Sequence, residues 1–206
     1  LSNAARHHWY AVQPQVGCAL GWIARHAPEL DGDPGRIAMI GDSAGGNLVV
    51  NSAYMAATGT LPSACAPSPS PRIRAVVAVV PALYTKELAT NPYPVIGPAV
   101  ASMLHSYTGG TPQQYPSRYE SFESERFISA SAPPTLLLAG ESDHLVAADQ
   151  SRRFAARAEQ AGVQVRRVAI PFTNHVFGLA STSYSRQALR QLTLHWLGKH
   201  MPTDGR

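Results

Sequence analysis

Four short apolar segments predict the strands of a central sheet. They cover residues 36–40, 73–80, 135–139 and 164–170, and Val, Ile, Leu and Ala dominate them. The segment 73–80 is almost continuously apolar, which is typical of a strand buried on both faces of a parallel sheet. Pro81 follows it directly and should end it.

Helices are predicted between and around these strands. Apolar residues recur at a helical spacing over 12–26, where Pro14 fits only in the first turn. Similar patterns predict three more helices, over 47–57, 147–161 and 184–200. Because strands and helices alternate, we expect one domain of the α/β class over residues 1–206, with a mostly parallel sheet flanked by helices.

Residues 82–132 depart from this alternation. Proline and tyrosine recur along the segment, and one helix is indicated around 98–107, with Gly109 and Gly110 ending it. The segment is longer than a simple crossover between two strands needs. We therefore interpret it as an inserted cap or lid, with an irregular surface excursion as the alternative.

The candidate chemistry lies where the first predicted strand meets a helix, in the sequence Gly41-Asp42-Ser43-Ala44-Gly45-Gly46. A G-x-S-x-G sequence in this strand-turn-helix context is typical of a nucleophilic serine held at the tip of a tight turn. The turn requires a strained backbone at Ser43, and we expect Gly41, Ala44 and Gly45 to supply the small side chains that it needs. The first amides of the helix would then point toward a developing oxyanion. A glycine-rich turn without chemistry is the alternative.

A nucleophilic serine needs a base, and the base needs an acid that fixes its tautomer. Ligands of parallel sheets bind beyond the carboxyl ends of the strands, and Asp143 and His175 follow the third and fourth predicted strands. His175 is the expected base, because His144 adjoins the acid and the other histidines precede the turn or lie in predicted helices or the cap. Asp143 is the expected acid. Glu141 in the same loop is the alternative, and Asp149 is interpreted as a helix cap or a solvated charge.

Composition and charge narrow the class of partner. The 206 residues include 17 Lys and Arg against 13 Asp and Glu, and the arginines are scattered, so we do not expect nucleic-acid binding. The sequence contains no run of about 18 apolar residues, so it predicts no membrane-spanning helix. Cys18 and Cys65 would allow one disulfide, but we expect two free thiols. The compartment stays open, with the cytoplasm slightly favoured, and a homo-oligomer is left open too.

The turn segment, with Gly32-Asp33-Pro34-Gly35-Arg36-Ile37 before it, resembles the hormone-sensitive-lipase-like carboxylesterase branch of the α/β-hydrolase family. Asp143 in Asp-His-Leu-Val and His175 in His-Val-Phe match that family's acid and base, and the resemblance covers about 17–197. It implies a serine carboxylesterase that hydrolyses small-molecule esters through an acyl-serine and without a metal or cofactor. We expect short to medium acyl chains, because the sequence shows no long apolar lid. Ser43 would be the nucleophile, and the amide of Ala44 would donate one hydrogen bond in the oxyanion hole.

One feature of that family is absent. Its members carry a His-Gly-Gly-Gly-type segment that completes the oxyanion hole, and no His-Gly pair precedes Gly41. The predicted sheet also has fewer strands than the family's, so we expect this sequence to begin partway through the fold. Losing one oxyanion donor costs about 100- to 1000-fold in rate. A serine peptidase on the same fold and a non-catalytic binding module therefore stay as alternatives.

Overall fold

A four-stranded parallel sheet forms the centre of the protein. The computed structural model describes residues 8–65, 71–91, 93–175, 177 and 183–202. Its strands stand in the order β1-β2-β3-β4, and each pairs in parallel with the next. They are β1 (Ile37–Asp42), β2 (Ile73–Val79), β3 (Thr135–Gly140) and β4 (Val165–Ile170). All four predicted strands are confirmed, and β1 runs further than predicted, up to the residue before Ser43.

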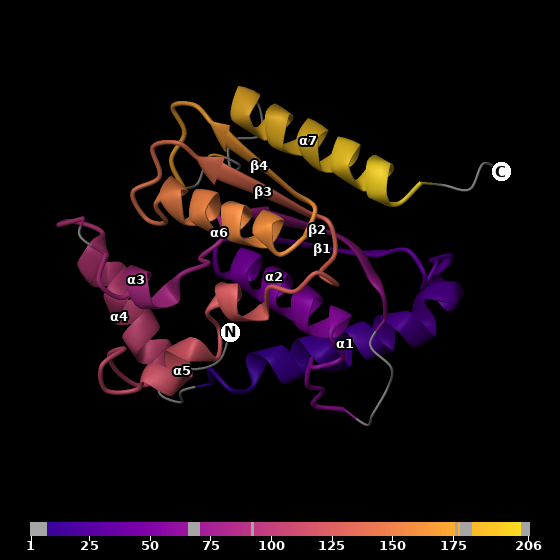
Figure 1. Ribbon diagram of the computed structural model, residues 1–206, viewed down its shortest axis with the longest axis horizontal. Coiled ribbons are helices and arrows are strands. Elements are labelled where there is room, and N and C mark those ends of the chain that lie inside the picture. The colour runs from indigo at the N-terminus through magenta and orange to yellow at the C-terminus, as the bar shows by residue number, and fades with distance from the viewer. Residues whose placement is uncertain (1–7, 66–70, 92, 176, 178–182, 203–206) are drawn as a thin grey trace.

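Helices cover both faces of this sheet (Figure 1). On one face lie α2 (Ala44–Ala57) and α6 (Ala148–Gln160), and on the other lies α7 (Tyr184–His200). Helix α1 (Val12–His26) packs on α2 and continues into the short η1 (Ala27–Leu30). The predicted helices are confirmed, except that α2 begins earlier, directly after Ser43. No helix within the described ranges is long and apolar enough to cross a membrane.

Two apolar clusters bury the two faces of β2. Val76 and Ala78 belong to a cluster with residues of α2 and α6, including Tyr54 and Phe154. The alternating positions Ala75, Val77 and Val79 pack on the other side with Trp196 of α7. Burying each large apolar side chain contributes about 1.5–3 kcal/mol. Strand β2 is therefore buried on both faces, as its apolar pattern predicted. The sheet can hold in place the loops at both ends of its strands.

Residues 82–132 form short helices on the side of the sheet where the strands end (Figure 1). These helices are α3 (Thr85–Leu88), α4 (Gly97–Thr108), α5 (Pro116–Glu120) and η2 (Ser124–Phe127). Helix α4 is the one predicted, and Gly109 ends it with a φ of 90°, in the left-handed region. Asn47 of α2 donates hydrogen bonds to the carbonyl oxygens of Ala82 and Phe122, at 2.8 and 2.9 Å. The start and the end of the segment are therefore fastened to the same helix.

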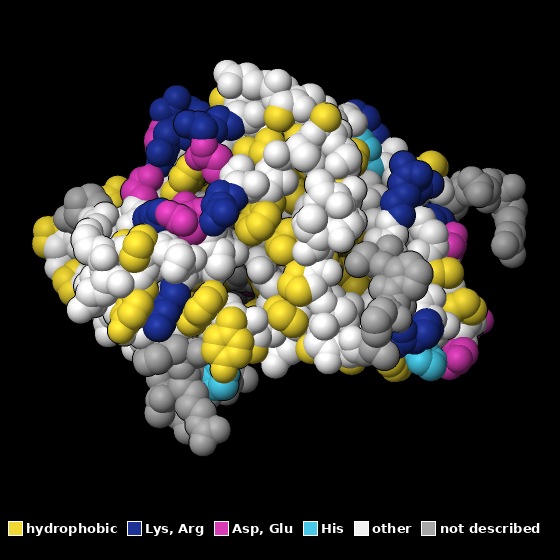
Figure 2. All heavy atoms as spheres, turned by 60° about the horizontal axis from the view of Figure 1, so that its bottom comes forward, with side chains coloured by type: hydrophobic (Ala, Val, Ile, Leu, Met, Phe, Trp, Pro, Cys, Tyr) yellow, Lys and Arg dark blue, Asp and Glu magenta, His cyan; other side chains and the backbone are white. Residues whose placement is uncertain are grey.

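Ion pairs fasten this segment to α6 as well. Arg153 pairs with Glu87 and Arg157 pairs with Glu125, each joining α6 to a residue of the segment. Figure 2 shows the result on one face, where basic and acidic side chains lie beside each other. Exposed pairs contribute about 0–1 kcal/mol each, so they orient the segment more than they stabilise it.

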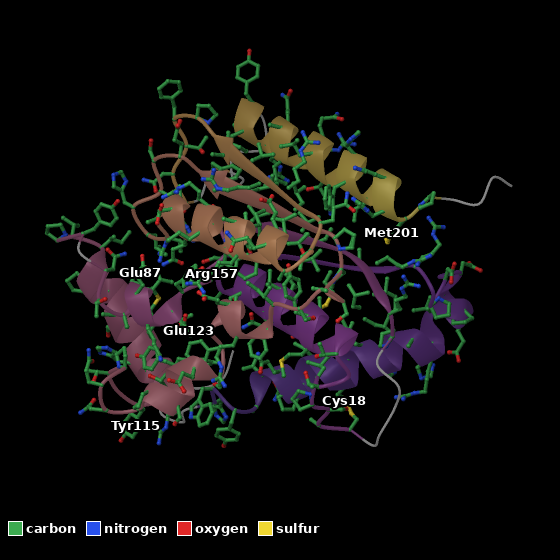
Figure 3. All side chains as sticks on the ribbon, viewed as in Figure 1. Cys18, Glu87, Tyr115, Glu123, Arg157 and Met201 are labelled. Carbon is green, nitrogen blue, oxygen red and sulfur yellow. A yellow bond between two sulfur atoms is a disulfide. The ribbon has the colours of Figure 1, made fainter. Side chains whose placement is uncertain are left out.

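A disulfide joins Cys18 to Cys65, so the prediction of two free thiols is wrong. The Cα atoms are 5.1 Å apart, although the two residues lie 47 positions apart in the chain. The chain after α2 turns back along α1, where Cys18 lies (Figure 3). There the Ala64 amide donates to the Pro14 carbonyl at 2.8 Å. This return is a long-range contact, which two isolated cysteines in a sequence do not reveal.

Candidate active site

Ser43 occupies the strained turn between β1 and α2 that the sequence predicted. Its backbone has a φ of 53° and a ψ of −119°, a conformation that costs about 1–3 kcal/mol for a residue other than glycine. Backbone hydrogen bonds hold it from both sides. Its amide donates to the Val79 carbonyl at 2.8 Å, and its carbonyl accepts from the amides of Asn47 and Ala82. The surrounding elements therefore fix the direction of this side chain.

The glycines around Ser43 do not share one role. A Cβ on Gly41 would lie 2.3 Å from the carbonyl oxygen of Gly45, and one on Gly46 would lie 2.9 Å from Cβ of Pro81. A Cβ on Gly45 would meet nothing within 4 Å. The expected need for a small residue is confirmed for Gly41 and wrong for Gly45, because α2 turns that position toward open space. Asp42, between them in the motif, is exposed.

The structure brings the three predicted side chains together from the ends of three strands. Nε2 of His175 lies 2.8 Å from Oγ of Ser43, and Nδ1 of His175 lies 2.8 Å from Oδ2 of Asp143. The side chain of Asp143 is 1% exposed and that of His175 is 12% exposed. A buried carboxylate in contact with one ring nitrogen leaves the other nitrogen to accept the proton of the serine hydroxyl.

The carboxylate of Asp143 is fully engaged. Its Oδ1 accepts the amides of Leu145 and Val146, at 2.8 and 2.9 Å, while Oδ2 faces His175. Such charge-assisted hydrogen bonds fix the orientation of the group. Glu141, the alternative acid, is exposed, and Asp149 pairs with Arg152 and Arg153 on the surface of α6.

Asn174 is a residue of this site that the sequence did not single out. Its Oδ1 accepts the backbone amides of His175 at 2.7 Å and of His144 at 3.2 Å, and its Nδ2 lies 3.1 Å from Nδ1 of His144. It therefore ties the loop after β3 to the loop after β4, and it engages the ring of His144. Its position directly before the candidate base could have indicated this role, because asparagine side chains in loops often form hydrogen bonds with nearby backbone groups.

A cavity of about 810 Å³ opens beside Ser43 and His175. Its wall is mainly apolar and comes from β1, β2, α3, α4, the loop after β3 and α7. The residues that contribute large side chains to it are Ile40, Leu88, Met103, Leu104, Leu145 and Leu189. Small-molecule sites are typically cavities of about 300–1000 Å³ with apolar walls and few polar groups. This cavity is therefore suited to the apolar part of a small molecule whose polar group lies at the serine.

The amide of Ala44 lies at the start of α2, directly after Ser43. The first amides of a helix have no intrahelical carbonyl to bond, and the helix dipole makes this end partly positive. The amide is thus available to an oxygen atom next to the serine. Within the described part of the chain, no group of three or more His, Cys, Asp or Glu side chains could hold a metal ion.

Glu123 supports residues 82–132 from inside, at the position labelled in Figure 3. Its Oε1 accepts the hydroxyl of Thr85 at 2.5 Å and the amide of Lys86 at 2.6 Å. Burial raises the pKa of the Glu123 carboxyl, while these hydrogen bonds and the Lys86 charge lower it by less. The start of α3 is thereby held close to the cavity wall by a partly buried carboxylate.

Comparison with known proteins finds one family of folds and several esterases that resemble this chain. A family model described as alpha/beta hydrolase fold matches residues 2–179. The chain is 29% identical to esterase LipQ of Mycobacterium tuberculosis over 188 residues, which are 90% of this chain and 43% of LipQ. It is 30% identical to the probable carboxylic ester hydrolase LipM of the same species over 184 residues, 88% of this chain and 41% of LipM. The chain spans less than half the length of these two curated relatives.

The fold is also found among solved structures. Esterase LipW from Mycobacterium marinum superposes with a TM-score of 0.69 at 26% identity. The superposition covers 90% of this chain and 56% of that one. The family match over residues 2–179 includes the four strands, the turn at Ser43, and the residues Asp143 and His175.

Proposed function

This chain belongs to the α/β-hydrolase fold family, and we propose that it is a serine carboxylesterase that acts through an acyl-serine intermediate. The observation that carries the proposal is the pair of 2.8 Å contacts linking Ser43 to His175 and His175 to Asp143. Its relatives are esterases, which supports ester hydrolysis as the reaction class.

Acylation begins when Oγ of Ser43 attacks the carbonyl carbon of the ester. Nε2 of His175 takes the hydroxyl proton, and Asp143 stabilises the resulting imidazolium at Nδ1. The carbonyl oxygen becomes negatively charged and accepts a hydrogen bond from the amide of Ala44. When the tetrahedral intermediate collapses, His175 gives its proton to the departing alkoxide, which leaves as an alcohol.

Deacylation repeats the same proton transfers with water. His175, again neutral, takes a proton from a water molecule that attacks the acyl carbon. The proton then returns to Oγ of Ser43 as the carboxylic acid leaves. Each transfer uses the same two contacts of His175, so one fixed ring serves both halves of the reaction.

Residues 82–132 act as the cap in this proposal. Helix α4 contributes Met103 and Leu104 to the cavity beside Ser43, and Asn47 and Glu123 hold the ends of the segment. An acyl chain placed against these side chains gains about 0.8 kcal/mol for each buried CH₂. The kcat/KM should therefore rise with acyl-chain length until the cavity is full, and we propose short to medium acyl chains as the substrates.

A panel of p-nitrophenyl esters, from acetate to dodecanoate, tests this proposal alongside peptide anilides. We expect the highest kcat/KM for a short or medium ester, and a loss of at least about 10⁴-fold in Ser43→Ala. Ser142→Ala is the matched control, because Ser142 is an exposed serine at the same edge of the sheet. Faster cleavage of anilides would favour the peptidase, and no turnover by the folded chain would favour the binding module.

A further inference from the structure

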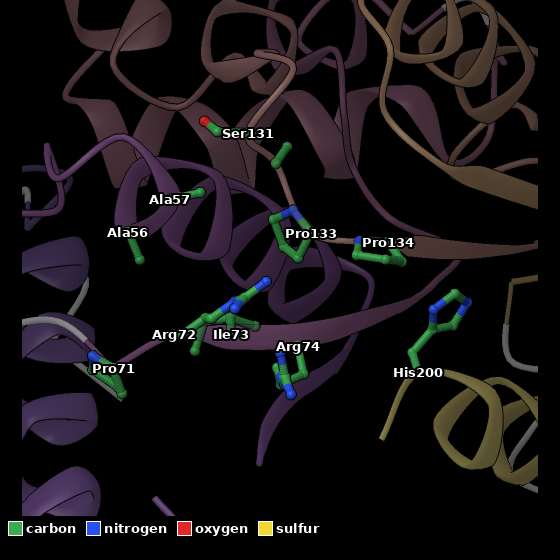
Figure 4. A pocket seen from close by; sticks show the side chains of 11 residues that line it. Ala56, Ala57, Pro71, Arg72, Ile73, Arg74, Ser131, Pro133, Pro134 and His200 are labelled. Atoms are coloured by element: carbon green, nitrogen blue, oxygen red, sulfur yellow. The ribbon is translucent and has the colours of Figure 1, made fainter. Parts of the chain in front are cut away.

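A second cavity lies at the opposite edge of the sheet, where the strands begin. It has a volume of about 520 Å³, and its wall comes from the end of α2, the start of β2, the segment before β3 and the end of α7. Figure 4 shows Arg72 and Arg74 of the β2 side and His200 of α7 around it. None of the described residues that line the cavity is acidic.

Several buried donors near this cavity have no hydrogen-bond acceptor within the described structure. They include Nε of Arg74 and Nε2 of His200, which both line the cavity. Nε1 of Trp196, whose ring centroid lies 4.2 Å from that of His200, is a further one. A buried donor without an acceptor costs about 1–3 kcal/mol, and such groups are rare in native proteins. Two such nitrogens, of Arg74 and His200, line one cavity and indicate a partner that binds there.

The charge balance of the cavity favours an anion. Helices α2 and α7 both end at this cavity, and each C-terminus brings about half a negative charge. The guanidinium groups of Arg72 and Arg74 bring two full positive charges. Amides of residues 58–60 also bond the last carbonyls of α2, which weakens the negative end of that helix. The net potential inside the cavity is therefore positive.

We propose that this cavity binds a phosphate group, either as inorganic phosphate or as the phosphoryl group of a small organic molecule. The planar guanidinium of Arg74 offers paired N–H donors that match the spacing of phosphate oxygens. Arg72, which is exposed, lies at the mouth of the cavity. Nε2 of His200 supplies a further donor in the tautomer that carries its proton there. This site is separate from Ser43 and does not depend on the esterase proposal.

Calorimetric titration of the full chain with inorganic phosphate tests this inference, with chloride added to keep the ionic strength constant. We expect saturable binding, weakened at least about tenfold in Arg74→Met, because hydrogen bonds to charged groups are strong. Methionine keeps most of the apolar stem of the arginine in place. The matched control is Arg190→Met, which removes an exposed arginine of α7 outside the cavity and should leave binding unchanged.

A second arm uses phenyl phosphate to distinguish the two sources of the phosphate group. Tighter binding than inorganic phosphate would assign an organic phosphate to the site, and equal binding would assign the free anion. Nuclear magnetic resonance of the His200 ring gives a readout in the unmodified protein, where phosphate should shift its signals. No saturable binding, or equal binding by Arg74→Met and the unmodified chain, would overturn the proposal. So would His200 signals that do not respond to phosphate.

Discussion

The polar groups at the carboxyl ends of the strands bond one another, whereas several of those at the amino ends have no partner in the described structure. At the carboxyl edge, Ser43, His175 and Asp143 bond one another, and backbone amides occupy the remaining oxygen of the aspartate. At the opposite edge, where the strands begin, Nε of Arg74 and Nε2 of His200 are buried and have no hydrogen-bond partner among the described residues. In our proposals the closed network acts on an entering ester, whereas the open set of nitrogens binds an anion. Changes at the first edge should therefore alter the rate, and changes at the second should alter stability or binding.

The largest effect is expected from Asp143→Asn at the carboxyl edge. The uncharged asparagine side chain cannot stabilise the imidazolium of His175, and it favours the wrong tautomer of that ring. The kcat should therefore fall by about 10⁴-fold. Steady-state hydrolysis of the best ester measures it, and the far-ultraviolet circular dichroism should not change. Glu141→Gln, which neutralises an exposed acid of the same loop, is the control and should retain full activity. Equal losses in both variants would contradict the assignment of the acid.

Removal of the disulfide should instead affect stability. The bridge joins residues 47 positions apart, and the loop-entropy relation then gives a contribution of about 4 kcal/mol to the free energy of unfolding. The double variant Cys18→Ser, Cys65→Ser should lose up to that amount in urea unfolding. Its kcat should stay within about twofold of the original, because no residue of α1 lines the cavity beside Ser43. A large fall in kcat without a loss of stability would contradict a purely stabilising role for the bridge.

The turn at Ser43 offers a matched pair of glycine variants with smaller effects. Gly41→Ala places a Cβ 2.3 Å from the carbonyl oxygen of Gly45, and such overpacking costs about 1–3 kcal/mol. Gly45→Ala places a Cβ in open space within a helix, where alanine is favoured by up to about 1 kcal/mol. Urea unfolding at constant m-value measures both. Two variants of equal stability would mean that the close packing of the turn does not matter.

The smallest effect concerns the pH dependence of stability through Glu123. Burial raises the pKa of this carboxyl in the folded state, above its ordinary value of 4.5. The stabilisation from its bound proton is fully present below that ordinary value and is lost as the pH rises through the raised pKa. The free energy of unfolding of the unmodified chain, minus that of Glu123→Gln, should therefore fall as the pH rises from 4.5 through the raised pKa of Glu123. Chemical unfolding at several pH values measures it, and a constant or rising difference would contradict the effect of burial.

Local patterns predicted the elements and the candidate site well. The apolar segments identified all four strands, and the strand-turn-helix context identified Ser43, because both signals lie within a few neighbouring residues. Asp143 and His175 followed from their positions after strands, since parallel strands bring their carboxyl ends to one edge. The catalytic roles of these residues stay predictions until they are tested in solution.

Long-range contacts account for what the sequence did not predict. The bridge between Cys18 and Cys65 depends on the return of a loop along α1. The contrast between Gly45 and Gly46 depends on which of them faces Pro81, and the brace at Asn174 depends on the distance between two loops. The cavity at Arg74 combines the end of α2, the start of β2, the segment before β3 and the end of α7, and no motif in the sequence links these four places.

Intact-mass analysis after treatment with a fluorophosphonate tests the central claim most directly. The reagent reacts with a serine only when a neighbouring base activates it. We expect a single adduct on the unmodified chain, slower labelling of Asp143→Asn, and no adduct on Ser43→Ala. No adduct on the folded, unmodified chain, or an adduct that persists in Ser43→Ala, would contradict the claim that His175 and Asp143 activate Ser43.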